Sequence, residues 1–235
     1  MNTTEYLSKW AISYKDDIIN NIMPFWMKYG LDREHGGVYT CVNRNGSLMD
    51  TTKSVWFQGR FAFICSYAYN NIEKNPQWLA ASKSCIDFIE AHCFDTDGHM
   101  FFEVTEDGKP LRKRRYVFSE GFAAIAMAEY ALATGEKEYA KKALDIFKRT
   151  LHFLNTPGFL EPKYLPTLPS KGHSITMILI NTASRIRMVI DDPSLTEQID
   201  TSIAALRKYF IHPEFKALLE MVGPDGEFID TCNGR

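Results

Sequence analysis

The apolar residues of this chain recur mostly at steps of three and four positions, as they do on the buried face of an amphipathic helix. In the first such run, Leu7, Trp10, Tyr14 and Ile18 fall on one face of a helix predicted over about residues 5–28. The same periodicity continues to the end of the chain and predicts a mostly helical protein. The further predicted helices cover residues 52–73, 76–93, 117–133, 137–154, 173–190 and 194–210.

Three short apolar segments between the predicted helices each lead into an Asn-Gly or Asp-Gly dipeptide. These dipeptides favour tight hairpin turns because glycine tolerates positive φ. The turn glycines are spaced by roughly one and two multiples of sixty residues, which predicts a repeated unit of two helices and a short hairpin or loop. The segments are residues 36–40, 100–104 and 218–222, and the glycines are Gly46, Gly108 and Gly226.

Two architectures are compatible with such a repeat. A helical solenoid is open-ended and serves as a binding scaffold, whereas a toroid of helical hairpins closes around a central pocket. Residues 56–64 (WFQGRFAFI) are apolar and aromatic on most sides, as expected for the covered inner helix of a toroid. We therefore predict an all-α toroid with short β-hairpin insertions. No linker divides residues 1–235, which are predicted to form one domain.

Composition and charge narrow the possible functions. The 235 residues are 45% hydrophobic and 13% aromatic, which excludes general disorder. Lys and Arg number 27 against 29 Asp and Glu, so a dedicated nucleic-acid-binding protein is disfavoured. No apolar stretch is long enough to cross a membrane, and the polar start lacks the pattern of a secretion signal. We expect a cytoplasmic protein without a membrane segment.

The sequence contains no recognisable metal or cofactor motif. HExxH, P-loop and GxGxxG patterns do not occur, and the cysteines form no CxxC pair. An odd number of widely spaced cysteines predicts free thiols in a reducing compartment. We therefore predict no bound metal and no cofactor. The cysteines are Cys41, Cys65, Cys85, Cys93 and Cys232.

Arg60 is the most informative charged residue. On a helix it would share a face with Trp56, Phe63 and Tyr67. A guanidinium is almost never buried without a partner, so Arg60 is either a salt-bridged or solvent-reaching side chain or a fixed cation in a polar site. In the second interpretation it faces an anionic or polar oxygen, and the neighbouring rings suit the C–H faces of a sugar.

A run of four basic residues at 112–115 precedes another predicted helix. Such a run usually forms a solvated loop, and no basic stripe continues it towards a nucleic-acid surface. Tyr116 and Glu120 follow, one turn apart at the helix start, where backbone amides favour anions. These two residues either line a pocket, or Glu120 neutralises the arginines.

His173 stands where a Pro-rich loop enters an apolar helix, after Lys171 and Gly172. A lone histidine is more often a hydrogen-bonded structural residue than a functional one, but this is the only histidine placed at such an entry. The other histidines, His99 among them, lie beside turns or near helix ends, and we assign them no role. No convincing pair of carboxylates for glycoside hydrolysis is apparent.

Taken together, three separated stretches resemble the N-acylglucosamine 2-epimerase family, which includes cellobiose 2-epimerases. They occur in the family's order, and the resemblance extends over essentially the whole chain. The resemblance implies the (α/α)6 barrel of that family, in agreement with the predicted toroid. The stretches are residues 53–60, 110–120, and 171–174 followed by 177–183.

The resemblance also implies a reaction. Family members invert C2 of a reducing sugar through ring opening and an enediolate, with histidines moving the proton and a cation near O1. It places Arg60 as that cation and His173 as a second catalytic residue that holds the sugar or assists ring opening. Trp56, Tyr116, Glu120 and Lys171 are the predicted substrate-binding residues. No metal is needed for this proton transfer.

The resemblance covers only the N-terminal part of the family sequence. The two histidines that act at C2 lie in a part of the family sequence beyond residue 235, so we expect the N-terminal three-fifths of an epimerase domain, inactive alone. The expected partner is a small sugar, and a homodimer is one candidate assembly. An aldose–ketose isomerase of the same fold and a non-catalytic helical scaffold remain as alternatives.

Overall fold

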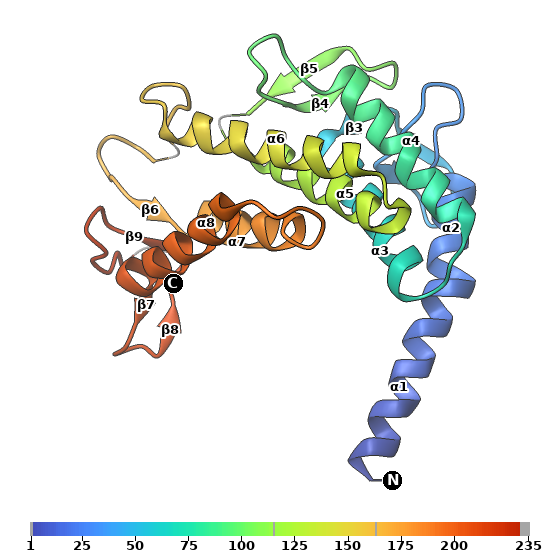
Figure 1. The fold of residues 1–235 in the computed structure, drawn as a ribbon, viewed down its shortest axis with the longest axis horizontal. Helices are drawn as coiled ribbons and strands as arrows, with labels where there is room; N and C mark the ends of the chain where they lie inside the picture. The colour runs from blue at the N-terminus through green and yellow to red at the C-terminus, as the bar shows by residue number, and fades with distance from the viewer. Residues whose placement is uncertain (1, 115, 163, 231–235) are drawn as a thin grey trace.

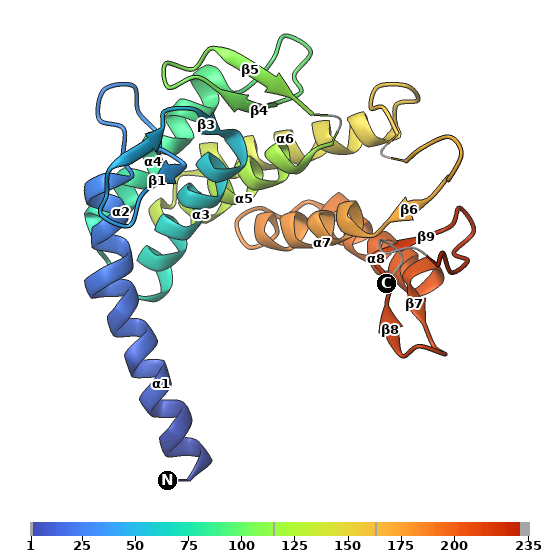
Figure 2. The ribbon, with the colours of Figure 1, turned by 180° about the vertical axis from the view of Figure 1, so that it is seen from behind.

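Helices make up most of the chain in the computed structural model, which describes residues 2–114, 116–162 and 164–230. Six of them form three successive pairs joined by short loops, and the first members of the pairs pack side by side. In Figures 1 and 2 this gives two layers, with α3, α5 and α7 in one and α4, α6 and α8 in the other. The predicted all-α arrangement of hairpins is confirmed. The pairs are α3 (Val55–Asn71) with α4 (Pro76–His92), α5 (Phe118–Thr134) with α6 (Lys137–Asn155), and α7 (Ser174–Ile186) with α8 (Pro193–Ala205).

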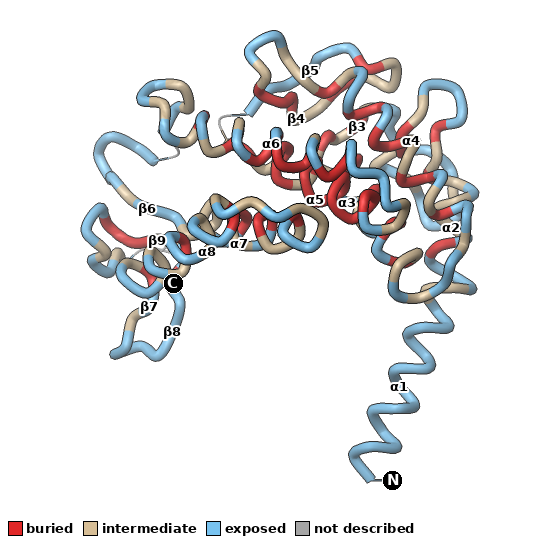
Figure 3. Tube along the Cα trace, in the orientation of Figure 1, coloured by how far each residue is buried: buried red, intermediate tan, exposed pale blue. Residues whose placement is uncertain are grey.

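The first predicted helix is divided into α1 (Thr3–Asp17), a π-helical turn η1 (Ile18–Ile22) and α2 (Met23–Tyr29). Pro24 lacks the N–H that an α-helix would use at this position, which accounts for the loosened turn just before it. The expectation of a buried apolar face is wrong for α1, which contains no buried residue within the described chain. Figure 3 shows this helix exposed along its length.

A second π-helical turn, η2 (Leu206–Phe210), extends α8 to the end of the predicted 194–210 helix. The boundaries of the other helices agree with the predictions to within a few residues. Gly135, with φ +77°, ends α5 and separates it from α6 as expected.

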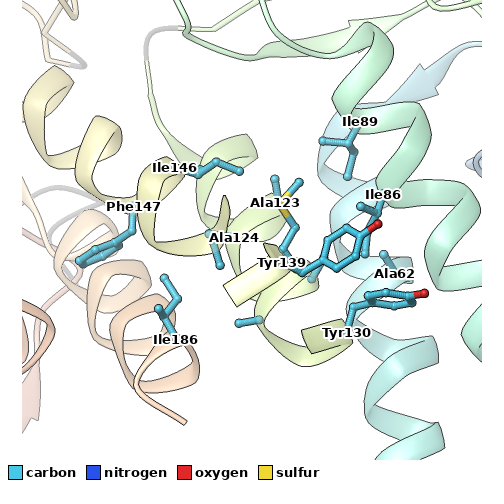
Figure 4. Packing of buried hydrophobic residues seen from close by; sticks show 14 of the residues in the cluster. Ala62, Ile86, Ile89, Ala123, Ala124, Tyr130, Tyr139, Ile146, Phe147 and Ile186 are labelled. Carbon is cyan, nitrogen blue, oxygen red and sulfur yellow. The ribbon is translucent and has the colours of Figure 1, made fainter. Parts of the chain in front are cut away.

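The core lies around α5, whose residues are buried on nearly every side. Figure 4 shows Ala123 and Ala124 of α5 packed among side chains from α3, α4, α6 and α7. Two glycines allow the inner helices to approach closely. A Cβ at Gly59 of α3 would lie 2.7 Å from the backbone carbon of Phe122, and one at Gly121 would lie 2.8 Å from Ile178 Cγ1 of α7. Small residues therefore set the spacing of the inner layer.

The β-structure consists of short strands in loops at the ends of the helices. Two predicted hairpin turns are confirmed, at Gly46 and at Gly108. β1 pairs with β2 across Gly46, although β1 begins at Cys41, after the predicted segment 36–40, and β4 pairs with β5 across Gly108. The third is wrong, because residues 218–222 form the end of β8 and all of β9, which pair with β7 and β6 and not across Gly226. The strands are β1 (Cys41–Val42), β2 (Leu48–Asp50), β3 (Lys53–Ser54), β4 (Phe101–Val104), β5 (Pro110–Lys113), β6 (Lys171–Gly172), β7 (Ile211–His212), β8 (Ala217–Leu218) and β9 (Met221–Val222).

Lys53, fully buried in β3, joins this strand to two loops. Its Nζ donates to Asp32 Oδ2 at 2.7 Å and to the carbonyls of Gly36 at 2.8 Å and Glu106 at 2.7 Å. Burial opposes ionisation of Asp32, but hydrogen bonds from Lys53 and the amides of His35 and Glu34 lower its pKa below the ordinary value. All three ammonium protons are thus paired, as a buried cation requires.

Replacing Gly59 by Ala should lower the free energy of unfolding by about 1–3 kcal/mol, because the added methyl group collides with the α5 backbone. Urea unfolding measures the effect. Gly172→Ala is the matched control, since a Cβ there would lie 3.8 Å from its nearest neighbour. Equal effects of the two substitutions would contradict the close-approach explanation.

Replacing Lys53 by Met should cost about 3–5 kcal/mol of unfolding free energy, because Asp32 would remain buried without its partner. Lys109→Met removes an ion pair whose lysine side chain is 77% exposed, and should cost far less because solvent screens an exposed pair. The two urea midpoints should therefore differ clearly, and similar midpoints would rule out the proposed importance of the buried pair.

Candidate active site

Aromatic side chains gather where α3 and α5 begin. The Trp56 ring lies 5.8 Å from that of Tyr116, 5.3 Å from that of Phe118 and 5.7 Å from that of Phe122. Trp56 Nε1 is buried and has no hydrogen-bond partner among the described residues. The predicted neighbours Trp56 and Tyr116 are thus brought together from segments sixty residues apart in the sequence.

Arg60 is exposed on α3, and its guanidinium carbon lies 5.1 Å from the ring centroid of Phe122 and 5.6 Å from that of Phe57. Phe122 also contacts Trp56, so the cation borders the aromatic cluster. A different guanidinium, that of Arg185, lies over the rings of Phe63 and Tyr67, which were predicted to share a helix face with Arg60.

Arg60 lines a cleft of about 400 Å³ between α2 and α3, together with Trp26, Tyr39 and Phe57. Burial and the nearby charge of Asp32 raise the pKa of Tyr39 to about 12, so its phenol keeps its proton at neutral pH. Most of the other lining is apolar. The cleft therefore offers a positive group and a phenol against a largely apolar wall.

His173 borders a second cleft, of about 430 Å³, along the exposed side of α7. Its ring lies 6.0 Å from that of Phe210, and its buried Nδ1 has no hydrogen-bond partner among the described residues. Asn181 and Arg185 line the same cleft. Lys171 is exposed on β6, and its Nζ lies 4.1 Å from the ring centroid of Tyr209, outside the lining of this cleft.

Glu120 lies in the interior rather than on a pocket wall, with 1% of its surface exposed. Its Oε1 lies 2.5 Å from His99 Nδ1 and accepts from the Met100 amide at 2.7 Å, while Oε2 has no partner among the described residues. Glu120 was expected either to line a pocket or to neutralise the arginines of residues 112–115. It instead forms this buried pair with His99. The other ring nitrogen of His99, Nε2, lies 2.8 Å from the Arg114 carbonyl oxygen.

Both nitrogens of His99 thus face oxygen acceptors, which favours the doubly protonated ring. Burial opposes protonation, but the hydrogen bond and charge of Glu120, with the Arg114 carbonyl, raise the pKa of His99 above its ordinary value. The pair therefore holds the backbone at Arg114, just after β5. The sequence around His99 showed only that it lies beside a turn. It did not indicate this role, because the partner, Glu120, is 21 residues away.

No group of three or more His, Cys, Asp or Glu side chains suited to a metal ion occurs in the described part of the chain. Cys41, Cys65, Cys85 and Cys93 are free thiols, while Cys232 lies outside the described residues. Burial raises the pKa of the Cys93 thiol to about 12, which makes it a poor nucleophile. None of the helices formed by residues 2–114, 116–162 and 164–230 combines the length and apolarity needed to span a bilayer.

The fold is that of known sugar-epimerase structures. The structure of cellobiose 2-epimerase from Bacillus thermoamylovorans matches with a TM-score of 0.82 and 20% identity, over 94% of this chain and 61% of that one. The predicted (α/α)6 class is thereby confirmed. At this level of identity the likeness concerns the fold alone.

The sequence comparisons identify the family. The family profile of N-acylglucosamine 2-epimerase (GlcNAc 2-epimerase) matches residues 37–220, and the chain belongs to this family. The N-acylglucosamine 2-epimerase of Rattus norvegicus is 28% identical over 226 residues, which are 92% of this chain and 54% of that protein. The cellobiose 2-epimerase of Eubacterium cellulosolvens is 28% identical over 153 residues, 64% of this chain and 37% of that protein. The chain spans about half the length of the rat relative.

The raised pKa of His99 makes a pH-dependent contribution to stability. A group whose pKa is higher in the folded state stabilises the fold below its unfolded pKa, and this contribution is lost as the pH rises through the folded pKa. Unfolding free energy should therefore decline as the pH rises above about 6.5, the ordinary histidine value. Urea titrations between acid and mildly alkaline pH measure this slope.

His99→Gln should flatten that slope, while His152→Gln, which changes an exposed histidine, should leave it unchanged. An unaltered slope in His99→Gln would exclude the buried pair as its source.

Proposed function

We propose that this chain contributes the substrate-binding part of a carbohydrate 2-epimerase that acts on an N-acylglucosamine-type sugar. Membership of the family and the exposed cation beside an aromatic cluster support the proposal. Inversion at C2 requires loss of the C2 proton from the open-chain aldehyde and return of a proton to the opposite face. Negative charge develops on O1 in the enolate formed between these steps.

Arg60 is the group proposed to stabilise that charge. Its guanidinium carries several N–H donors and is always positive, so it lowers the energy of an oxyanion relative to a neutral carbonyl. The rings of Phe57 and Phe122 fix the side chain and limit its hydration. This one observation, an anchored cation on the open face of an inner helix, carries most of the proposal.

The remaining predicted residues take supporting roles. Trp56 and Tyr116 shape an apolar wall suited to the C–H face of the sugar, and His173, at the edge of the α7 cleft, is proposed to hold the sugar. Lys171 lies near the same end of α7 and is proposed to contact substrate only at the rim. Glu120 acts indirectly, since it pairs with His99 and thereby holds the backbone at Arg114.

We further propose that the groups which move the C2 proton come from polypeptide outside these residues, so that the chain alone does not turn over sugar. We propose that the complete enzyme works in the cytoplasm, as a homodimer or as a monomer. Residues 1–235 are proposed to belong to a single domain of that enzyme. Within this scheme the chain supplies binding and charge stabilisation.

The first test is binding. Nuclear magnetic resonance titration of the 235-residue chain with N-acetylglucosamine should show saturable binding that weakens at least about tenfold in Arg60→Met. Arg44→Met, which removes an exposed arginine from the β1–β2 turn, is the control and should bind as the unchanged chain does. Absence of sugar binding would overturn the proposal and favour a helical scaffold.

The second test is turnover. N-Acetylglucosamine incubated with the chain alone should not yield N-acetylmannosamine, whereas a longer polypeptide that contains the chain should. Arg60→Met in that polypeptide should reduce kcat by about a hundredfold or more, the scale of one lost oxyanion donor. Mannose, which carries a hydroxyl group at C2, tests the alternative: a ketose product from mannose would instead identify an aldose–ketose isomerase. Normal turnover by the chain alone would contradict the assignment of the C2 proton transfer to residues outside it.

A further inference from the structure

Glu129 is a carboxylate inside the most buried helix of the chain, α5, and only 2% of its surface is exposed. Its Oε1 accepts a hydrogen bond of 2.8 Å from Asn70 Nδ2 of α3. Its Oε2 lies 3.7 Å from Nη1 of Arg185 on α7. One carboxylate therefore joins all three inner helices, and a buried charge of this kind needs such partners.

Arg185 itself is not buried in this pair. Its side chain is 29% exposed and lines the α7 cleft. Its guanidinium carbon lies 5.4 Å from the ring centroid of Phe63 and 5.3 Å from that of Tyr67, two rings that stack on each other. In the described part of the chain, the hydrogen bond of this guanidinium goes to the weak acceptor Met188 Sδ, at 3.9 Å, and its ion pair with Glu129 Oε2 spans 3.7 Å. Most of its N–H donors are left for a ligand.

The charge of the pair indicates the kind of ligand. Glu129 neutralises Arg185, so the cleft presents oriented donors without a net positive charge. Such a site suits hydroxyl or amide oxygens rather than a phosphate or carboxylate. The stacked rings of Phe63 and Tyr67 offer an apolar surface beside these donors, as required by a neutral carbohydrate with both C–H and O–H groups.

Arg185 lies over α3 residues that follow Arg60 along the helix. Phe63 and Tyr67, over which Arg185 lies, are three and seven residues beyond Arg60 on α3, about 5 and 10 Å along the helix axis. An extended six-carbon sugar has a comparable length. A chain whose O1 lies at Arg60 would therefore bring its far end towards Arg185.

We propose that Arg185 is a specificity-determining residue that donates hydrogen bonds to uncharged oxygens at the end of the sugar remote from O1, and that Glu129 is the positioning residue that orients it and cancels its charge. This inference rests on the proposed function, because it assumes that a sugar occupies the inner face of α3 and α7. It selects neutral sugars over phosphorylated ones.

The test compares N-acetylglucosamine with N-acetylglucosamine 6-phosphate, titrated against the 235-residue chain by nuclear magnetic resonance. The unchanged chain should bind the neutral sugar at least as tightly as the phosphate. Glu129→Gln leaves the charge of Arg185 uncompensated, so it should shift the affinity ratio towards the phosphate by about tenfold, and added salt should reduce this shift. An unchanged ratio in Glu129→Gln would overturn the positioning role.

Arg185→Met should weaken binding of the neutral sugar at least about fivefold. Arg187→Met changes an exposed arginine two residues away, whose Nη1 donates to Thr196, and should have no effect. If Arg185→Met does not fold, Arg185→Lys keeps the charge but loses the planar fork of donors, and should also weaken binding. Full affinity for the sugar in a folded Arg185 variant would overturn the proposal. The contact of Arg185 with Phe63 and Tyr67 would then be structural.

Failure of this inference can be told apart from failure of the proposed function. Binding that depends on Arg60 but not on Arg185 would overturn the specificity role alone. Absence of binding of either sugar to the unchanged chain would overturn both.

Discussion

The close approach of the three inner helices is the constraint on which the rest of the molecule depends. Gly59 and Gly121 remove the side chains that would otherwise hold α3, α5 and α7 apart, and alanines fill most of the space that remains on α5. Close packing fixes the rotation of each helix about its axis. Arg60 follows Gly59 directly, and both lie against Phe122, so this contact also sets the direction in which the cation points.

Two buried ion pairs then hold the loops to this helical layer. Lys53 and Asp32 connect β3 with two loops, and His99 and Glu120 connect the loop before β4 with the start of α5. Removal of charged groups from water is costly, and both pairs offset that cost with further hydrogen bonds to backbone groups. Strand β3, which leads into α3, and the chain at Arg114 are therefore positioned by ion pairs as well as by apolar packing.

The two arginines on the inner face differ in how their charge is compensated. Arg60 is held by rings and keeps its full charge, whereas Arg185 is held by rings and by a carboxylate that cancels its charge. This asymmetry agrees with the proposed function, in which negative charge develops at one end of the sugar only. Glu129 could have been noticed in the sequence, since a carboxylate in a largely apolar helix needs a buried partner. Its partner could not, because Arg185 is 56 residues away.

The sequence by itself determined the helices, the turns at Gly46, Gly108 and Gly135, the family and the prominence of Arg60. Each of these depends on local periodicity, on the backbone freedom of glycine or on a contiguous motif, all of which can be read within a short window. Only the tertiary structure decided that Glu120 pairs with His99, that β9 pairs with β6, and that the cation over Phe63 and Tyr67 is Arg185. Buried charges and short strands take whichever partner the packed helices bring near them, and that choice is made by distances between segments far apart in the chain.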